Sequence, residues 1–239
     1  MTSLQIPERY NYIAVFLTLR CNLHCPYCLN RWGGAGRDPG LIPGKEWLVG
    51  LNRLVARPDL PVTLQGGEPT LHPDFYGIVR GLRKDLPIDL LTNLQFDLDR
   101  FMTEVPPDRM RRPAPYASIR VSYHPDVMDL PLLIKKTAKL QKHGYSVGIW
   151  AVDHPRHRAA IASARKACAK ADIDFRIKEF LGFEQARLHG TYRYPDAIQG
   201  AIGSPVECRT SELIVGPRGD VFRCHSDLYA GRNPIGHLL

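Results

Sequence analysis

The sequence predicts an α/β protein with a partial (β/α)6 TIM-like barrel and a small C-terminal β-hairpin extension. Short apolar runs alternate with helical patterns along most of the chain, and such continuous runs are typical of parallel strands buried on both faces. Parallel neighbours are joined by right-handed crossovers, so the series curves into an open or closed barrel. Polar and glycine-rich segments follow several strands, where barrels carry their chemistry.

Six strands are expected, at 13–17, 62–65, 88–92, 118–122, 147–152 and 175–178. The helices between them are expected from Pro43 onward and at 74–84, 98–110, 130–143 and 156–171. Pro43 favours a helix start, and Gly144 is a typical residue just beyond a helix end. Pro106 and Pro107 break the third helix.

The pattern changes beyond Phe180, and we predict a barrel core at 1–182 and an extension at 183–239. Residues 182–205 show little periodicity and are expected to form loops. Two apolar runs, 213–215 and 221–223, flank a glycine-containing turn and predict a β-hairpin.

The 239 residues carry a formal net charge of +8 and no apolar run approaching the ~20 residues of a membrane span. The polar start does not resemble a signal peptide, so we expect a cytoplasmic protein with reduced cysteines. The densest basic groups are 109–112 and 135–142, the second on an amphipathic helix pattern. A solvated helix face explains such charge, and we do not infer nucleic-acid binding from it.

Three cysteines, Cys21, Cys25 and Cys28, lie within eight residues in the loop after the first strand. Thiolates at this spacing can surround one iron–sulfur cluster, and three ligands for four irons leave one iron open. An odd number in a reduced compartment argues against disulfides. A zinc site stays open as an alternative, with His24 as the fourth ligand.

The Cys-x3-Cys-x2-Cys pattern, with Tyr27 before its last cysteine, resembles the signature of the radical S-adenosylmethionine (SAM) superfamily. The resemblance implies a [4Fe-4S] cluster on Cys21, Cys25 and Cys28, with SAM bound to the open iron. It implies reductive cleavage of SAM to a 5′-deoxyadenosyl radical that abstracts hydrogen from substrate. It also implies a flavodoxin or ferredoxin electron donor and places the Tyr27 backbone near the adenine.

A second motif, Gly66-Gly67-Glu68-Pro69, ends the second strand about forty residues later. It resembles the superfamily motif that binds the amino group of SAM, since glycines permit close approach and a carboxylate can pair with ammonium. By the same resemblance Asn93 faces the site, although Leu94 replaces the usual following glycine. Ser122 is then expected near the ribose and Val152 near the adenine.

Histidines follow two strands at the expected barrel mouth, His124 after the fourth and His154 after the fifth. They are candidates for substrate binding or proton transfer, with loop shaping by the His-Pro pairs as the alternative. Lys178 and Glu179, at the end of the sixth strand, are weaker candidates for pocket groups.

Cys208 and Cys224 flank the predicted hairpin and resemble the start of a SPASM or twitch extension, which would add an auxiliary iron–sulfur cluster. Further cysteines are absent downstream, so we expect a truncated chain, an extension that has lost its cluster, or substitute ligands such as His225 or Asp227. Cys168 lies on an apolar helix face and is expected in the core.

The residues therefore predict a radical SAM enzyme acting on a peptide or small metabolite. A glycyl-radical-enzyme activase is an alternative, although residues 29–42 contain no cysteine for the ferredoxin-like insert of such enzymes. An alternative of another class is a non-catalytic, metal-bearing module that binds nucleic acid through the positive charge.

Overall fold

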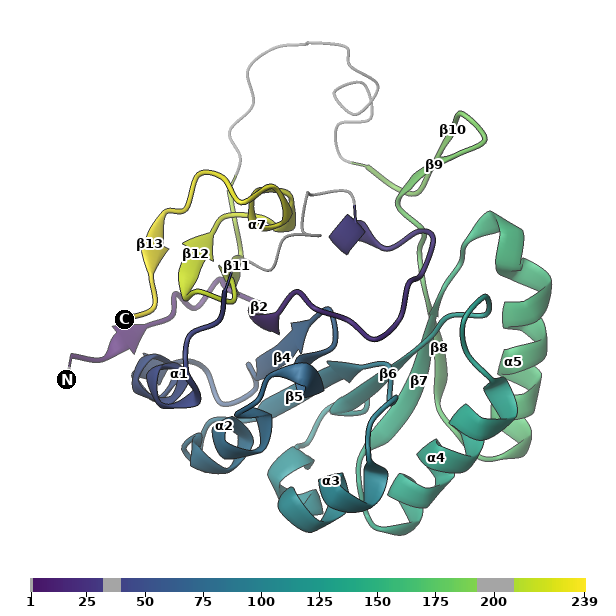
Figure 1. Ribbon diagram of the computed structural model, residues 1–239, viewed down its shortest axis with the longest axis horizontal. Coiled ribbons are helices and arrows are strands. Elements are labelled where there is room, and N and C mark those ends of the chain that lie inside the picture. Colours follow the sequence, from purple (N-terminus) through teal and green to yellow (C-terminus); the bar gives the residue numbers. More distant parts are fainter. Residues whose placement is uncertain (1, 32–39, 193–208) are drawn as a thin grey trace.

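A curved sheet forms the centre of the molecule in the computed structural model, which describes residues 2–31, 40–192 and 209–239. Six of its strands are parallel and neighbour one another in chain order (Figure 1). They are β2 (Tyr12–Thr18), β4 (Val62–Gly66), β5 (Ile88–Thr92), β6 (Ile119–Tyr123), β7 (Val147–Val152) and β8 (Phe175–Lys178). β8 lies at one edge of the sheet, so the barrel is partial, as expected.

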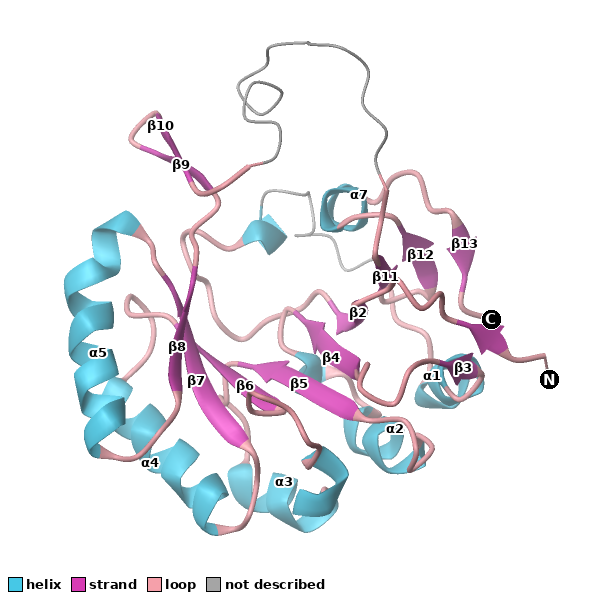
Figure 2. Cartoon of the chain, turned by 180° about the vertical axis from the view of Figure 1, so that it is seen from behind, coloured by secondary structure: helices cyan, strands magenta, loops and turns pink. Residues whose placement is uncertain are grey.

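Five helices cover the outer face of these strands in both views (Figures 1 and 2). They are α1 (Gly44–Leu51), α2 (Phe75–Gly81), α3 (Leu98–Glu104), α4 (Leu130–Lys142) and α5 (Arg158–Lys170). α2 is shorter than expected because Leu82 is already extended. α3 ends before Pro106 and Pro107, and a separate 3-10 turn, Pro107–Met110, follows.

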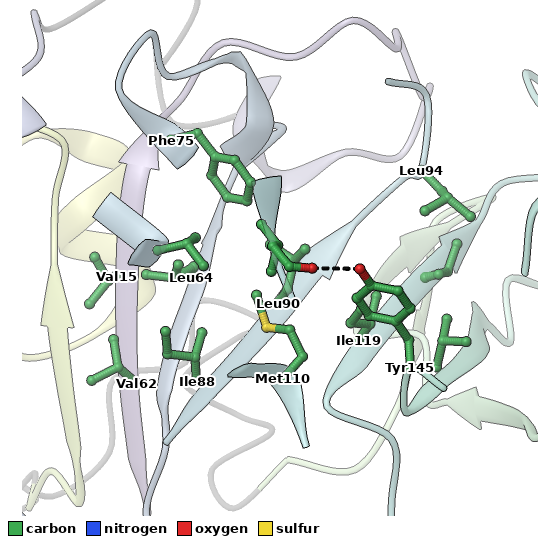
Figure 3. Close-up of a cluster of buried hydrophobic side chains, with 14 of the residues drawn as sticks. Val15, Val62, Leu64, Phe75, Ile88, Leu90, Leu94, Met110, Ile119 and Tyr145 are labelled. Carbon is green, nitrogen blue, oxygen red and sulfur yellow. Dashed lines mark hydrogen bonds between the residues drawn. The ribbon is translucent and has the colours of Figure 1, made fainter. Parts of the chain in front are cut away.

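Alternate strand residues give the sheet two different faces. Val15, Val62, Leu64, Ile88 and Leu90 point to the helices and are almost completely buried (Figure 3). Burying each such side chain contributes about 1.5–3 kcal/mol. The residues between them face the barrel interior and include polar groups, and those groups form the site.

The C-terminal segment extends the same sheet. β11 (Glu212–Val215) pairs in parallel with β2, then β12 (Asp220–Phe222) and β13 (Gly236–His237) follow antiparallel. α7 (His225–Ala230) packs through Leu228 into a second apolar cluster with Phe16 and Ile214. The predicted hairpin is confirmed, and it extends the sheet beyond β2. The division at residues 182 and 183 stays a prediction.

A β-hairpin replaces part of the loop expected after residue 182, formed by β9 (Gly182–Glu184) and β10 (Arg187–His189). Its two turn residues, Gln185 and Ala186, have φ of 50° and 60°. Hairpin turns with both residues left-handed are normally marked by Asn or Gly. The sequence lacks that signal, which is why the hairpin was not predicted.

Another small element directly follows the first helix. β3 (Leu54–Val55) pairs in parallel with β1 (Leu4–Gln5), and α1 ends at Leu51. No helix among the described residues is long and apolar enough to span a membrane.

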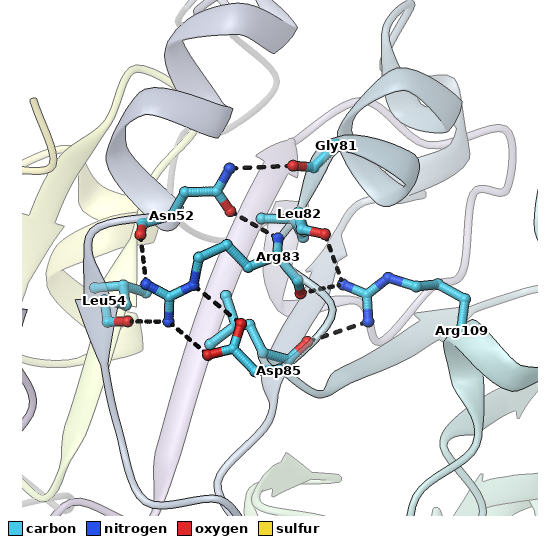
Figure 4. Close-up of polar contacts among 8 residues, drawn as sticks. Asn52, Leu54, Gly81, Leu82, Arg83, Asp85 and Arg109 are labelled. Carbon is cyan, nitrogen blue, oxygen red and sulfur yellow. Dashed lines mark hydrogen bonds and ion pairs between the residues drawn. The ribbon is translucent and has the colours of Figure 1, made fainter.

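The basic group at 109–112 has structural roles. The Arg109 guanidinium donates to four backbone carbonyls around the end of α2, including those of Leu82 and Arg83 (Figure 4). Arg83 in turn donates to the carbonyls of Asn52 and Leu54. These bonds satisfy carbonyls that a helix end leaves without partners. This part of the positive charge is therefore used within the fold.

Candidate functional site

The three clustered cysteines lie in the loop after β2, at the carboxyl ends of the parallel strands. Cys25 is 6% exposed, and Cys21 and Cys28 are half-buried. The Cys28 amide donates to the Cys25 carbonyl at 3.2 Å, which turns the chain back between these two residues. The Leu23 amide donates to Cys21 Sγ at 3.4 Å.

One cavity of about 180 Å³ brings the cysteine loop together with the ends of β4, β5 and β6. Its lining residues are Cys21, Leu23, Cys25, Cys28, Asn30, Gln65, Gly66, Gly67, Leu91, Thr92, Asn93, Ser122, His124 and Tyr229. Segments separated by up to about two hundred positions in the chain thus meet here. Carboxyl ends of neighbouring parallel strands share one edge, and the sequence prediction of a shared site rested on that geometry.

The two glycines after β4 hold the cysteine loop by close backbone contact. A Cβ on Gly66 would lie 2.0 Å from the Thr18 carbonyl oxygen, and one on Gly67 would lie 2.2 Å from that of Arg20. The Gly67 amide donates to the Thr18 carbonyl at 2.9 Å, and the Glu68 amide donates to the Arg20 carbonyl at 2.8 Å. The glycines are therefore required for packing against the loop as well as for lining the cavity.

Glu68 is fully buried and binds the protein itself. Its Oε1 accepts from the Thr70 amide and hydroxyl at 3.2 and 2.7 Å, and its Oε2 accepts from the Asn93 amide at 2.7 Å. The Thr92 hydroxyl lies within 3.0 Å of both oxygens. Burial raises the pKa of the carboxyl, opposed by these hydrogen bonds. Glu68 and the buried Pro69 do not line the cavity, so Glu68 joins the end of β4 to the end of β5.

The turn after β5 directs Asn93 toward the cysteine loop. The Asn93 side-chain Nδ2 donates to Asn22 Oδ1 at 2.7 Å and lies 3.8 Å from Cys21 Sγ. Leu94, which stands where a glycine is usual, has φ of 59° and is completely buried. Left-handed backbone costs a non-glycine residue about 1–2 kcal/mol. The turn keeps its shape because Leu94 packs in the core and its amide donates to the Thr92 hydroxyl at 3.0 Å.

The donor set fits an iron–sulfur cluster with a polar ligand. Burial, followed by the neighbouring Cys28 and Cys21 sulfurs, raises the pKa of Cys25 to about 12. Three crowded thiolates therefore need the compensating charge of a metal. A single metal ion requires at least three His, Cys, Asp or Glu side chains close together, and the described residues contain no such group. A cluster distributes its thiolates over separate irons. Asn30 Oδ1 and Gln65 Nε2 are buried, have no hydrogen-bond partner among the described residues, and belong to residues that line the same cavity.

Tyr27 lines a second cavity and contacts His124, which lines the first. Its hydroxyl lies 2.9 Å from His124 Nδ1, and its ring centroid lies 4.9 Å from that of His154 and 5.7 Å from that of His157. Burial raises the pKa of Tyr27 and lowers that of His124 to about 4. The phenol is thus the donor, and neutral His124 accepts through Nδ1. Only His124 of these four residues lines the cysteine cavity.

The second cavity measures about 670 Å³ and lies beside the β9–β10 hairpin. Its lining residues are Pro26, Tyr27, Leu29, Asp126, His154, Arg156, His157, Phe180, Leu181, Gly182, Phe183, Glu184 and Gln185. Its ionic groups pair with one another, since His157 Nε2 lies 2.9 Å from Asp126 and Arg156 contacts Glu184. His154 Nδ1 accepts from the Arg156 amide at 3.3 Å, so His154 also shapes its loop. Apart from Tyr27 and Gln185, the rest of the wall is apolar.

The structure brings some of the predicted site residues to the cysteine cavity but not all of them. Gly66, Gly67, Asn93 and Ser122 line the cysteine cavity, whereas Val152 lines neither cavity. Their roles toward SAM stay predictions. Gln65 and Tyr229 were missed. Gln65 directly precedes the glycine motif on an inward-facing strand position, whereas nothing in the sequence indicates that Tyr229 of α7 reaches the cysteine loop.

The predicted auxiliary site is only partly within the described residues. Cys208 lies outside them. Cys224 caps α7, where its Sγ accepts from the Asp227 amide at 3.4 Å. His225 lies 3.7 Å from Glu212 and contacts the Phe16 ring edge-on. An auxiliary cluster at Cys208 and Cys224 therefore stays a prediction, while Cys168 is completely buried in the core, as expected.

Comparisons with known proteins agree with this geometry. Residues 15–129 match the family model described as the Radical SAM superfamily. Over 74 residues, 30% of this chain, the sequence is 35% identical to a GTP 3′,8-cyclase of Listeria monocytogenes. Over 63 residues, 26% of the chain, it is 38% identical to the mycofactocin maturase MftC of Mycobacterium ulcerans. These segments span only 22% and 16% of those relatives.

Two solved structures share the fold across almost the whole chain. anSMEcpe, solved with bound AdoMet and the Cp18Cys peptide, superposes with a TM-score of 0.64 at 16% identity, over 95% of this chain and 77% of that one. Streptococcus suis SuiB, bound to its precursor peptide SuiA, gives 0.61 at 15% identity, over 96% and 62%. At such identities the likeness concerns the fold.

Proposed function

This chain belongs to the radical SAM superfamily and is an enzyme, and from that premise we propose that it cleaves SAM reductively at a [4Fe-4S] cluster and abstracts hydrogen from a peptide or small-metabolite substrate. The observation that carries the proposal is the shared cavity, which three thiols line together with the ends of β4, β5 and β6. When bound, the cluster supplies the electron and SAM supplies the radical that attacks the substrate. The protein supplies position and shelter.

The chain would hold the cluster through Cys21, Cys25 and Cys28. SAM would bind across the ends of the strands, where Asn93 and Ser122 present side-chain polar groups and Gly66 and Gly67 expose backbone. Glu68 acts one step removed, because its carboxylate holds the Thr92 and Asn93 turn in place. Tyr27 separates the two cavities and orients neutral His124.

The larger cavity supports a substrate that reaches the site from the side of the β9–β10 hairpin. It is walled by Phe180, Leu181 and Phe183, and Tyr27 in its wall contacts His124, which lines the cysteine cavity. SuiB and anSMEcpe, which share the fold, were solved with bound peptides, whereas a relative in sequence is a GTP 3′,8-cyclase. Both support an organic substrate larger than SAM alone. His154 would contact that substrate, and a flavodoxin or ferredoxin would deliver the electron.

The test is anaerobic iron–sulfur reconstitution followed by incubation with SAM and dithionite. We expect 5′-deoxyadenosine from the wild type and none from Cys25→Ala. Cys168→Ala is the matched control, because Cys168 is buried in α5 and outside both cavities. A reconstituted wild type that neither binds nor cleaves SAM refutes the proposal. Iron analysis separates about four irons from about eight, hence one cluster from two.

A further inference from the structure

The side chain of Asn93 faces the first cysteine of the cysteine loop. Its Nδ2 lies 2.7 Å from Asn22 Oδ1 and 3.8 Å from Cys21 Sγ, where the larger sulfur atom permits a longer hydrogen bond. An amide NH2 group carries two hydrogens, so each acceptor receives one. Asn93 is 5% exposed, so both contacts are shielded from water. Asn93 therefore brings a buried side-chain donor to a sulfur that is expected to bind iron.

Backbone groups fix which end of this carboxamide faces the sulfur. Asn93 Oδ1 accepts from the Gln95 amide at 2.9 Å, and Asn22 Nδ2 donates to the Gln95 carbonyl at 2.8 Å. Exchanging oxygen and nitrogen in Asn93 would place two donors opposite each other at the Gln95 amide. A backbone amide only donates and a carbonyl only accepts, so the NH2 group of Asn93 is the end that faces Cys21.

The turn after β5 holds Asn93 in this position. The Asn93 backbone amide donates to the buried Glu68 carboxylate at 2.7 Å, and the Leu94 amide donates to the Thr92 hydroxyl at 3.0 Å. Both the main chain and the side chain of Asn93 are thus restrained by bonds within the protein. The place of the Nδ2 donor relative to the cysteine loop follows from these bonds.

Cys21 Sγ has two donors, and they differ in kind. The Leu23 backbone amide donates at 3.4 Å, and Asn93 supplies the side-chain donor. A cysteine that binds iron is a thiolate, which only accepts, and its negative charge strengthens each hydrogen bond. Of the two donors, only that of Asn93 can be removed by a substitution.

We propose that Asn93 raises the reduction potential of the cluster by donating a hydrogen bond to the Cys21 thiolate. The inference rests on the proposed function, because it requires a cluster on the three cysteines. Hydrogen bonds to the sulfurs are among the factors that set the potential of such a cluster. The reduced state carries one more negative charge, so it gains more from the donor than the oxidised state does. Asn93 is therefore a positioning residue that acts through Cys21, and its oxygen keeps a second lone pair for SAM.

The test is a redox titration of the reconstituted protein without SAM, followed by electron paramagnetic resonance of the reduced cluster. Asn93→Ala removes the donor without adding charge. Asn93→Asp removes it and keeps the oxygen that accepts from the Gln95 amide. For Asn93→Ala we expect a loss of about tenfold in the equilibrium constant for reduction, which corresponds to about 59 mV for one electron. Asn93→Asp should lower the potential further, because it adds a negative charge. An unchanged potential in both variants overturns the proposal.

Asn22→Ala is the matched control for the shape of the loop. It breaks the bonds of Asn22 to Asn93 and Gln95 but leaves the Asn93 donor in the chain. We expect a smaller shift in potential than in Asn93→Ala. Equal shifts in the two variants would mean that loop shape, and not the donor, sets the potential, and would overturn the proposal.

A second readout reports the bond itself. The protein is produced with asparagine labelled with 15N in the side chain, and the reduced cluster is measured by pulsed electron paramagnetic resonance. A nitrogen that donates to a ligating sulfur shares in the electron spin of the cluster, so the wild type should show a 15N coupling. Asn93→Asp should lack this coupling and Asn22→Ala should keep it. Absence of the coupling in the wild type overturns the proposal, even where Asn93→Ala assembles no cluster.

Neither readout depends on SAM cleavage, so the two proposals fail separately. A shifted potential and a 15N coupling without 5′-deoxyadenosine formation would refute the proposed cleavage of SAM and leave the role of Asn93. Formation of 5′-deoxyadenosine, with an unchanged potential in both Asn93 variants, would refute the role of Asn93 alone. A wild type that assembles no cluster refutes both.

Discussion

The glutamate of the second motif should stabilise the fold before any cofactor binds. In the wild type, the Asn93 backbone amide donates to Glu68 at 2.7 Å. In Glu68→Gln, the best orientation of the new side chain keeps its oxygen toward Thr70 and turns its NH2 group toward that Asn93 amide. The variant loses one charge-assisted hydrogen bond, worth about 1.5–3 kcal/mol. It also places two buried donors opposite each other, and leaving a buried donor unsatisfied costs about 1–3 kcal/mol. We expect a loss of about 3–5 kcal/mol in the free energy of unfolding.

The assay is urea unfolding of the cluster-free protein under reducing conditions. A domain of ordinary stability, about 5–15 kcal/mol, should still fold after this loss. Glu8→Gln, which changes an exposed glutamate by the same atoms, should stay within about 0.5 kcal/mol of wild type. If Glu68 were only a ligand for SAM, the cluster-free variant would unfold at the wild-type urea concentration. That result would refute the structural role argued for Glu68.

Three other changes test the same geometry. Gly67→Ala should displace the cysteine loop and lower the iron content on reconstitution, because its Cβ would lie 2.2 Å from a backbone oxygen. Gly77→Ala is the control and should keep the wild-type iron content, because the space around Gly77 is open. Asp89→Asn should cost about 3–5 kcal/mol in urea unfolding, because two buried arginines that pair with Asp89, at 2.7 and 3.1 Å, lose their counter-charge. His124→Gln should flatten the pH dependence of stability between pH 7 and 4.

The sign of the histidine effect follows from its pKa. Folding lowers the pKa of His124 from 6.5 to about 4, so the unfolded chain binds a proton that the folded chain does not bind between these values. Stability should therefore fall as the pH falls from 7 to 4, by at most about 3 kcal/mol from this residue. Urea unfolding of wild type and His124→Gln at several pH values measures the difference. Parallel curves for the two proteins would contradict the assignment.

Local signals explain which parts of the site could be predicted. The spacing of Cys21, Cys25 and Cys28 and the position of Gly66-Gly67-Glu68-Pro69 at a strand end are properties of short segments, and the parallel-strand pattern brings such ends together. The pairing of β11 with β2 joins strands about two hundred residues apart. No local pattern specifies such a partner, so the sequence predicted the hairpin but not its place in the sheet.

Charged residues within apolar strands were a signal that could have been used. Asp89 and Arg120 each stand in the middle of a predicted buried strand, where an ionised group requires a partner. Opposite charges on neighbouring strands predict a pair, and the structure contains it at 3.1 Å. The buried Nε of Arg120 has no hydrogen-bond partner among the described residues, which could not be predicted because it depends on where each guanidinium nitrogen points.

The cysteine loop owes its shape to the strands beside it. Thr18 and Arg20 accept hydrogen bonds from the amides after β4, and the Asn22 side chain donates to the Gln95 carbonyl at 2.8 Å. The loop itself contains little regular structure between Thr18 and Leu29. These bonds are made within the protein and restrict the loop, and a restricted loop lowers the entropy that cluster binding must overcome. The motif after β4 therefore acts on the cluster through the backbone of the loop, in addition to any contact with SAM.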